Sequence, residues 1–155
     1  MSVDNPLTAS AIQRKVKCNF LLYENMHKIK NINDFLPRTL ILYQLASVGH
    51  FCCIFKNNEG IQFFDPMGDF PDDELQNNRG NAPNHGFAYL DNILMNSPLP
   101  VIYNQHELQK HGTATCGHWC TTRMIYESLY CDEFADCFKG VGNRDKIVVK
   151  LFNSF

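Results

Sequence analysis

Residues 111–120 read HGTATCGHWC and bring two cysteines and two histidines together. Such residues serve three kinds of chemistry: a metal site, a redox pair or a cysteine nucleophile. Structural zinc sites usually combine two close ligands with a second, separated pair, and the chain has no clear second pair. Redox pairs normally have the spacing C-x-x-C, whereas Cys116 and Cys120 are four residues apart. The stretch therefore favours a nucleophile.

Cys116 is the better placed of the two cysteines for that role. A thiol attacks as the thiolate, which the free N–H groups and the dipole at a helix N-terminus stabilise. Small residues at 113–117 suit a tight entry into a helix, and the helical pattern begins immediately afterwards. Gly117 is expected to let a substrate backbone pass close to the sulfur. Cys120 is expected to pack on the inward face of the helix.

A catalytic cysteine needs a base that is close in space and is often distant in sequence. Three histidines lie in polar segments typical of solvated loops: His85, His106 and His111. His118 lies on a different helical face from Cys116 and is poorly placed to reach its sulfur. His50 follows Gly49 at the start of an apolar strand, and element ends that face loops often carry functional residues. We therefore predict His50 as the base.

Asp65 is the predicted partner of that base, because a catalytic histidine needs a group that orients its second ring nitrogen. It ends the run IQFFD, which follows the turn signal NNEG and the run HFCCIF. The two runs indicate a hairpin, which brings the end of one strand beside the start of the other. His50, Asp65 and Cys116 thus form a predicted Cys-His-Asp set.

The remaining patterns predict one α+β domain over residues 1–155. Helical patterns occupy residues 8–17, with a cap at Thr8 or Ser10, then 31–37 (a short helix or turn), 87–95 and 119–130. Strand patterns occupy residues 39–45, 50–55, 61–65 and 99–104. Residues 66–75 predict a turn and a helix start with Asp72, Asp73 and Glu74 in its first turn, and residues 77–86 an exposed loop. This order predicts a small, mainly antiparallel sheet flanked by helices.

Composition narrows the class of protein further. A hydrophobic content of 45% fits a globular chain, and the net charge of −2 gives no general argument for binding nucleic acid or membranes. Seven cysteines are an odd set, and the chain shows no signal-peptide pattern, so we expect free thiols in a reducing compartment and no secretion. Five of them are expected to be small buried hydrophobes: Cys18, Cys52, Cys53, Cys131 and Cys137.

Three blocks of the sequence resemble a known family. GHFCCIF, IQFFDPMGDFPDDEL and YNQHELQKHGTATCGHWC are similar to the histidine, aspartate and glutamine–cysteine blocks of adenain-like cysteine proteases, the clan that includes the SUMO-specific proteases. The forms FDPMG and TCGHWC resemble above all the proteases of virophages, Maverick-type elements and related DNA viruses. The motifs cover roughly residues 38–127. Many members have Trp after the catalytic histidine where this chain has Phe51, and either ring can pack beside the imidazole.

The resemblance implies an adenain-like fold with the nucleophile at a helix N-terminus and peptide-bond hydrolysis through an acyl-enzyme. In it Cys116 attacks, His50 transfers protons, Asp65 orients the imidazole, and the amide of Gln109 stabilises the oxyanion together with the Cys116 backbone N–H. Gln109 lies seven residues before Cys116, a spacing that matches the family, whereas Gln105 lies eleven before it in a polar run. The apolar side chain before Gln109 is expected to anchor the loop against the core.

The family also implies a biological role. We expect a cysteine endopeptidase that cleaves viral structural-protein precursors during virion maturation, after small residues such as Gly, in the virion and in the host cytoplasm or nucleus. Its partners would be capsid precursors and a peptide or DNA activator, although the near-neutral chain gives little support for a DNA requirement; no membrane, metal or organic cofactor is implied. Two alternatives stay open: a protease of ubiquitin-like proteins, and a non-catalytic zinc-binding module.

Overall fold

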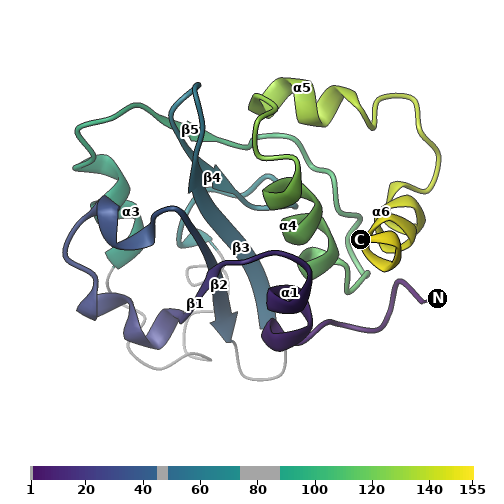
Figure 1. Ribbon diagram of the computed structural model, residues 1–155, viewed down its shortest axis with the longest axis horizontal. Helices are drawn as coiled ribbons and strands as arrows, with labels where there is room; N and C mark the ends of the chain where they lie inside the picture. Colours follow the sequence, from purple (N-terminus) through teal and green to yellow (C-terminus); the bar gives the residue numbers. More distant parts are fainter. Residues whose placement is uncertain (1, 45–48, 74–87) are drawn as a thin grey trace.

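A five-stranded sheet forms the centre of the molecule in the computed structural model, which describes residues 2–44, 49–73 and 88–155 (Figure 1). In spatial order the strands are β1 (Asn19–Leu22), β2 (Arg38–Gln44), β3 (Gly49–Lys56), β4 (Ile61–Phe64) and β5 (Val101–Tyr103). The three central strands pair antiparallel, whereas β1 joins β2 and β5 joins β4 in parallel. The α+β class is confirmed. The sheet is mixed: its two central pairings are antiparallel, as predicted, and both outer pairings are parallel, which was not predicted.

The sequence pattern did not indicate the two parallel pairings at the edges of the sheet. Parallel neighbours need a crossover connection, which a local sequence pattern does not reveal. Residues 19–22 were not predicted as a strand, and their pairing with β2 crosses two short 3-10 helices, η1 (Tyr23–Lys28) and η2 (Ile32–Phe35). The predicted hairpin of β3 and β4 is confirmed, with Cys53 opposite Phe64.

Strand β3 is buried on both faces and therefore separates two hydrophobic cores. Successive side chains in a strand point to opposite faces. Phe51, Cys53 and Phe55 belong to one core, while Cys52 and Ile54 belong to the other. This alternation fixes which face of the sheet each neighbouring helix covers.

The helices cover the two faces unequally. On the face of Phe51 lie α1 (Ala9–Lys15), α4 (Cys116–Ile125) and α6 (Arg144–Ser154), with α5 (Cys131–Asp136) packed at one end. On the opposite face lie η1, η2 and α3 (Tyr89–Met95). Figure 1 shows α4 between the sheet and α6. Residues 116–124 are buried, so this helix is enclosed along almost its whole length.

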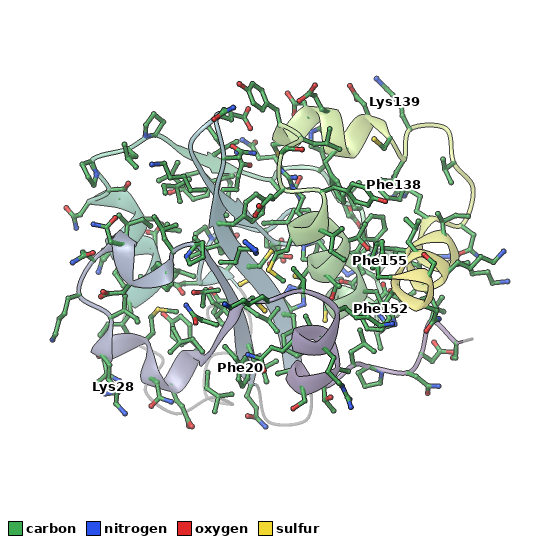
Figure 2. The ribbon with its side chains drawn as sticks, viewed as in Figure 1. Phe20, Lys28, Phe138, Lys139, Phe152 and Phe155 are labelled. Carbon is green, nitrogen blue, oxygen red and sulfur yellow. The ribbon has the colours of Figure 1, made fainter. Side chains whose placement is uncertain are left out.

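The segment that contains α5 also packs against α4. Figure 2 shows Phe138 turned inward beyond the end of α5, while the neighbouring Lys139 points outward. The rings of Phe138 and Trp119 meet edge-on with centroids 4.7 Å apart, and the Lys139 side chain is 83% exposed. Aromatic pairs in this geometry add to the gain from burial. Helix α4 is therefore packed on this side by aromatic rings from the segment of α5.

Several predicted elements agree with the structure to within a few residues. Thr8 caps α1, since its hydroxyl accepts a hydrogen bond from Ala11 N at 3.2 Å. The predicted helix over 119–130 begins earlier, at Cys116, and ends at Ile125. Residues 77–86 and Glu74 lie outside the described residues.

Three single residues differ from what the sequence predicted. Asp72 does not sit in a regular first helical turn: its backbone is left-handed, with φ of 70°, and its buried carboxylate accepts hydrogen bonds from Tyr43 and from Asp91 N. Cys137 is exposed and Cys18 is half-buried, whereas the other three cysteines predicted to be buried are buried. Cys137 follows Phe134 and precedes Phe138, which both face the core, so its own side chain points away.

Candidate active site

The hairpin of β3 and β4 places His50 beside Asp65. His50 is the second residue of β3, and Asp65 follows the last residue of β4. Nε2 of His50 lies 3.0 Å from Oδ1 of Asp65, with the two side chains 8% and 2% exposed. Oδ1 also accepts a hydrogen bond from Met67 N at 2.8 Å, so the turn after the strand fixes the carboxylate. The imidazole is thereby oriented through one of its nitrogens.

The electrostatic surroundings of His50 favour its charged form. Burial alone would lower the pKa of the imidazole, since a charge is poorly solvated there. The charge and hydrogen bond of Asp65, with a smaller contribution from Cys116, outweigh burial and raise the His50 pKa well above its usual value. A histidine that readily holds a proton is suited to forming an ion pair with a thiolate.

Cys116, the first residue of α4, is the third member of the predicted set. Its Sγ accepts a hydrogen bond from Phe51 N at 3.4 Å and interacts with the His50 side chain. Because Nε2 of His50 is engaged by Asp65, Nδ1 is the nitrogen left for the sulfur. Cys116 is 7% exposed. The structure therefore brings His50, Asp65 and Cys116 together, with a helix N-terminus and a backbone N–H at the sulfur.

Gln109 lies buried in the loop that leads to Cys116. Its Nε2 donates to the carbonyl of Thr113 at 3.0 Å, which leaves one amide hydrogen unassigned. Its Oε1 has no hydrogen-bond partner within the described part of the chain. The backbone N–H groups of Leu108 and Gln109 both donate to the carbonyl of Pro66 at 2.9 Å. This pair ties the glutamine loop to the turn that holds the aspartate.

The neighbours of Gln109 behave as the sequence predicted. Leu108 is 3% exposed and belongs to the core on the face of α4, so it anchors the loop. Gln105 is exposed. The hydrogen bond of Gln109 is made to Thr113 and not to His50 or Cys116.

The other histidines have different surroundings. His118 is buried on α4 with its ring edge-on to Phe152 of α6, at a centroid distance of 5.2 Å. Among the more exposed histidines, the ring of His106 contacts Asp132 at 2.8 Å and that of His111 contacts Glu107 at 3.4 Å. His85 lies outside the described residues. Of those described, His50 is the histidine whose side chain interacts with Cys116.

The residues considered for a zinc site do not converge. Cys120 is fully buried in the core, as predicted, and its thiol interacts with that of Cys53. His111 is on the surface, with its side chain 77% exposed. Over residues 2–44, 49–73 and 88–155, no three His, Cys, Asp or Glu side chains are grouped to hold a metal ion. All seven cysteines are free thiols.

Gly117 has a different role from the one predicted. A Cβ at this position would lie 2.9 Å from Cδ1 of Ile12, 3.3 Å from Cβ of Leu7 and 3.4 Å from Cδ2 of Phe51. Real Cβ atoms almost never approach so closely, so the chain itself fills the space beside the glycine. The prediction that a substrate backbone passes here is wrong: Gly117 lets the N-terminal segment and β3 pack against α4.

Two further polar residues support the site and were not singled out from the sequence. Asn104, just after β5, donates from Nδ2 to the carbonyl of Asp65 at 2.7 Å and to that of His106 at 3.0 Å. Asp145, in the first turn of α6, accepts a hydrogen bond from the hydroxyl of Thr115 at 2.6 Å. Asn104 lies in the block YNQHELQ, so its position after a strand was the available signal. Asp145 gave only the ordinary signal of an acid at a helix start.

Comparison with known proteins gives one informative match. The chain is 31% identical over 128 residues to "Uncharacterized protein V9" of the Sputnik virophage, in an alignment that covers 76% of this chain and 73% of V9. No family model and no solved structure matches the chain. Among the described residues, no helix has both the length and the apolar character needed to cross a membrane. The virophage relative supports a viral origin, and the chain belongs to the same family as protein V9 of the Sputnik virophage.

Proposed function

We propose that this protein is an adenain-like cysteine endopeptidase that processes viral structural-protein precursors during virion maturation. The observation that carries the proposal is the buried contact of 3.0 Å between His50 and Asp65, with Cys116 at the start of α4 interacting with the same imidazole. A nucleophile, a base and an orienting carboxylate in that order define the triad arrangement on unrelated folds. The viral relative supports the biological setting.

Acylation begins with the thiolate of Cys116 and the imidazolium of His50. The sulfur attacks the carbonyl carbon of the scissile peptide, and the carbonyl π electrons move to oxygen. The free N–H of the Gln109 amide and the Cys116 backbone N–H donate to that oxyanion. The oxyanion then collapses, the C–N bond breaks, and His50 gives its proton to the departing amine. Asp65 keeps the imidazole oriented throughout.

Deacylation runs through the same groups. A water molecule gives a proton to His50 and attacks the thioester carbonyl, so a second tetrahedral intermediate forms. Its collapse breaks the C–S bond, releases the carboxylic acid and returns the sulfur as thiolate beside the imidazolium. The balance needs only water and the peptide, and every proton is held by His50 between steps.

The burial of Cys116 bears on the choice of substrate. Only 7% of this residue is exposed, so a narrow approach to the sulfur favours a small side chain, such as that of Gly, before the scissile bond. A bulky residue there would have to displace the packed surroundings of α4, and interiors resist such changes. The cleavage products are expected to end in small residues.

The test is to incubate the purified protein with a mixture of virion proteins and to map new chain termini by mass spectrometry. Wild-type protein should create a restricted set of termini, and Cys116→Ala should create none while its thermal unfolding stays near that of wild type. Cys120→Ala, which removes the other thiol of the motif, should retain substantial activity. Parallel samples with ubiquitin-like fusion proteins and a metal analysis cover the two alternatives. Turnover that survives in Cys116→Ala, or bound zinc with no cleavage, would refute the proposal.

A further inference from the structure

Asp145 is a buried carboxylate that takes no part in the chemistry described above. It is 4% exposed and lies in the first turn of α6, where Asn143 caps the helix by accepting from Lys146 N. The positive end of the helix dipole favours an acid there. A buried carboxylate is nevertheless costly unless its oxygens accept hydrogen bonds. Its partners therefore indicate what it does.

These partners lie at the two ends of the nucleophile loop, which we define as residues 109–116. Oδ2 of Asp145 accepts a hydrogen bond from Lys110 N at 3.2 Å, next to Gln109. Oδ1 accepts from the hydroxyl of Thr115 at 2.6 Å, next to Cys116. A single carboxylate thus links the neighbours of the predicted oxyanion donor and of the predicted nucleophile.

A third hydrogen bond fixes the carboxylate to the helix that carries the nucleophile. The indole Nε1 of Trp119 donates to Oδ1 of Asp145 at 3.0 Å. Trp119 is fully buried, and its backbone N–H bonds to the carbonyl of Thr115 at 3.0 Å. Asp145 is therefore held against α4, and the nucleophile loop is held against Asp145.

The bonds inside the nucleophile loop are short-range and centre on one residue. Thr113 accepts from the Gln109 amide through its carbonyl, and its hydroxyl donates to the carbonyl of Lys110 at 2.7 Å. The hydroxyls of Thr113 and Thr115 lie 3.2 Å apart. These contacts shape the loop, but Asp145 is the group that contacts the backbone N–H at one end and the side chain at the other.

We propose that Asp145 is a positioning residue, which sets the separation of Gln109 and Cys116 by holding Lys110 and Thr115. This inference rests on the proposed protease function. A donor must meet the oxyanion that forms on the carbon bonded to the sulfur, so the separation of the two residues decides whether the oxyanion is stabilised. Displacements of about 1 Å can cost roughly 10²-fold in rate.

Asp145→Asn removes one of the two links between Asp145 and the nucleophile loop, the one to Lys110. An asparagine oxygen in the Oδ1 position keeps the hydrogen bonds from Thr115 and Trp119, while the amide nitrogen faces the N–H of Lys110 and cannot accept from it. The Gln109 end should loosen and the Cys116 end should hold. We expect kcat per folded molecule to fall by roughly 10–100-fold, with KM little changed. Alkylation of Cys116 by iodoacetamide should stay within about twofold of wild type, since it does not need the oxyanion hole.

Thr115→Val removes the other link, the hydrogen bond from the Thr115 hydroxyl to Asp145. Valine keeps the branched shape of threonine but cannot donate to Asp145. The start of α4 should then shift relative to His50, and both kcat and the alkylation rate of Cys116 should fall about tenfold. Thr115→Ser keeps the hydroxyl and should restore both rates. Asp136→Asn, the same chemical change on an exposed side chain, is the control.

The measurements use two features of the chain. Trp119 is its single tryptophan, so intrinsic fluorescence reports directly on the indole bonded to Asp145. Cys137 is exposed, so alkylation is followed in a Cys137→Ser background in which that thiol does not compete. Folded fractions come from urea unfolding, and rates use a peptide built on a mapped cleavage site. Fluorescence should be unchanged in Asp145→Asn, because its Oδ1 bond survives.

The outcomes separate this inference from the proposed function. Wild-type kcat in Asp145→Asn, or a loss that disappears after correction for the folded fraction, would overturn the positioning role. If Asp145→Asn does not fold, the Thr115→Val and Thr115→Ser pair decides, and equal alkylation rates in the two would overturn it. If wild-type protein cleaves nothing, the protease proposal fails. The alkylation rates still test whether Asp145 positions Cys116 through Thr115.

Discussion

Helix α4 carries an ionisable group near each end, Cys116 at its first residue and Arg123 near its last, and their surroundings differ. The guanidinium of Arg123 is 1% exposed and donates to the carbonyls of Tyr126 and Leu129 at 3.0 and 2.8 Å. It also lies 4.8 Å from the centre of the Phe55 ring. Burial lowers the Arg123 pKa, but an arginine stays charged at neutral pH. This end of the helix binds its charge with carbonyls and an aromatic face.

At the other end Cys116 receives one long backbone hydrogen bond, of 3.4 Å from Phe51 N. It also interacts with His50, whose own position is fixed by Asp65. In the proposed mechanism a proton moves between sulfur and imidazole at this end, whereas Arg123 keeps its proton. The comparison indicates that a buried charge with fixed partners contributes to stability, and that a buried thiol beside a second titratable group can exchange a proton with it. Variants at the two ends should separate activity from stability.

The largest effect is expected from removing His50, the group that exchanges a proton with Cys116 in the proposed mechanism. His50→Ala should lower kcat by roughly 10²–10⁴-fold, because general base catalysis and thiolate formation are lost together. His118→Ala should leave the rate per folded molecule far closer to wild type. The measurement is kcat on a mapped cleavage peptide. An inactive His118→Ala beside an active His50→Ala would reverse the assignment of the base.

Asp65→Asn is the milder version of that change and predicts a shift in pH dependence. The charge of Asp65 raises the His50 pKa, so its removal should lower that pKa. The reactive form needs protonated His50 beside the thiolate, and it is lost as pH rises through the His50 pKa. Cleavage needs that proton for the departing amine, so the alkaline limb of the kcat/KM profile should move to lower pH in Asp65→Asn. An unchanged limb would mean that this carboxylate does not set the charge of His50.

The next effect concerns the donor beside the thiol and not the thiol itself. Gln109→Ala should lower kcat by roughly 10²–10³-fold, the usual cost of an oxyanion donor. Alkylation of Cys116 should change little, since no oxyanion forms in that reaction. Gln105→Ala is the matched control, because Gln105 is exposed and should leave kcat nearly unchanged. The opposite pattern in the two kcat values would remove Gln109 from the site.

The sequence allowed the parts of the site that depend on local pairing to be predicted. His50 and Asp65 are joined by a hairpin whose turn, around Asn57 and Gly60, is marked by NNEG, so their proximity followed from short-range rules. The start of α4 at Cys116 followed from small residues before a helical pattern. Such signals are local because the interactions that they describe are local.

What the sequence did not allow to be predicted depends on contacts between distant segments. The partners of Asp145 lie 35, 30 and 26 residues away, so only the packing of α6 reveals them. The sequence predicted Asp72 to be an ordinary acid at a helix start, yet it is buried and accepts hydrogen bonds from Tyr43 and from Asp91 N. The sequence predicted that a substrate backbone passes beside Gly117, and the N-terminal segment fills that space. In each case tertiary packing overrode a local preference.

At the stable end of α4, Arg123→Met should change stability and not chemistry. The variant loses two charged hydrogen bonds and the contact with the Phe55 ring, while the carbonyl of Leu129 keeps a bond from Asn57. We expect a loss of about 2–4 kcal/mol in the free energy of unfolding, measured in urea. The kcat per folded molecule and the alkylation rate of Cys116 should be retained. A loss of kcat at unchanged stability would contradict the division between the two ends.

The smallest effect should come from His118, which lies at the Cys116 end of α4 and whose burial favours its neutral form. Burial lowers its pKa, although nearby Asp145 acts in the opposite direction. The unfolded chain takes up a proton on this residue near pH 6.5, while the folded chain does so only at lower pH. Between those two pH values the unfolded state binds more protons, so His118 makes the protein less stable as pH falls below about 6.5.

Replacing this residue isolates its contribution from that of His50. His118→Leu, of similar volume, cannot take up a proton and should flatten the decline in stability below about pH 6.5, by at most about 1.4 kcal/mol per pH unit. His50 acts in the opposite sense, because its raised pKa gives stability that is lost as pH rises through that value, and this contribution is common to both proteins. The difference between their urea unfolding curves at pH 5 to 8 therefore reports His118 alone. A difference that does not depend on pH would show that folding leaves the pKa of His118 unchanged, and would contradict its lowering by burial.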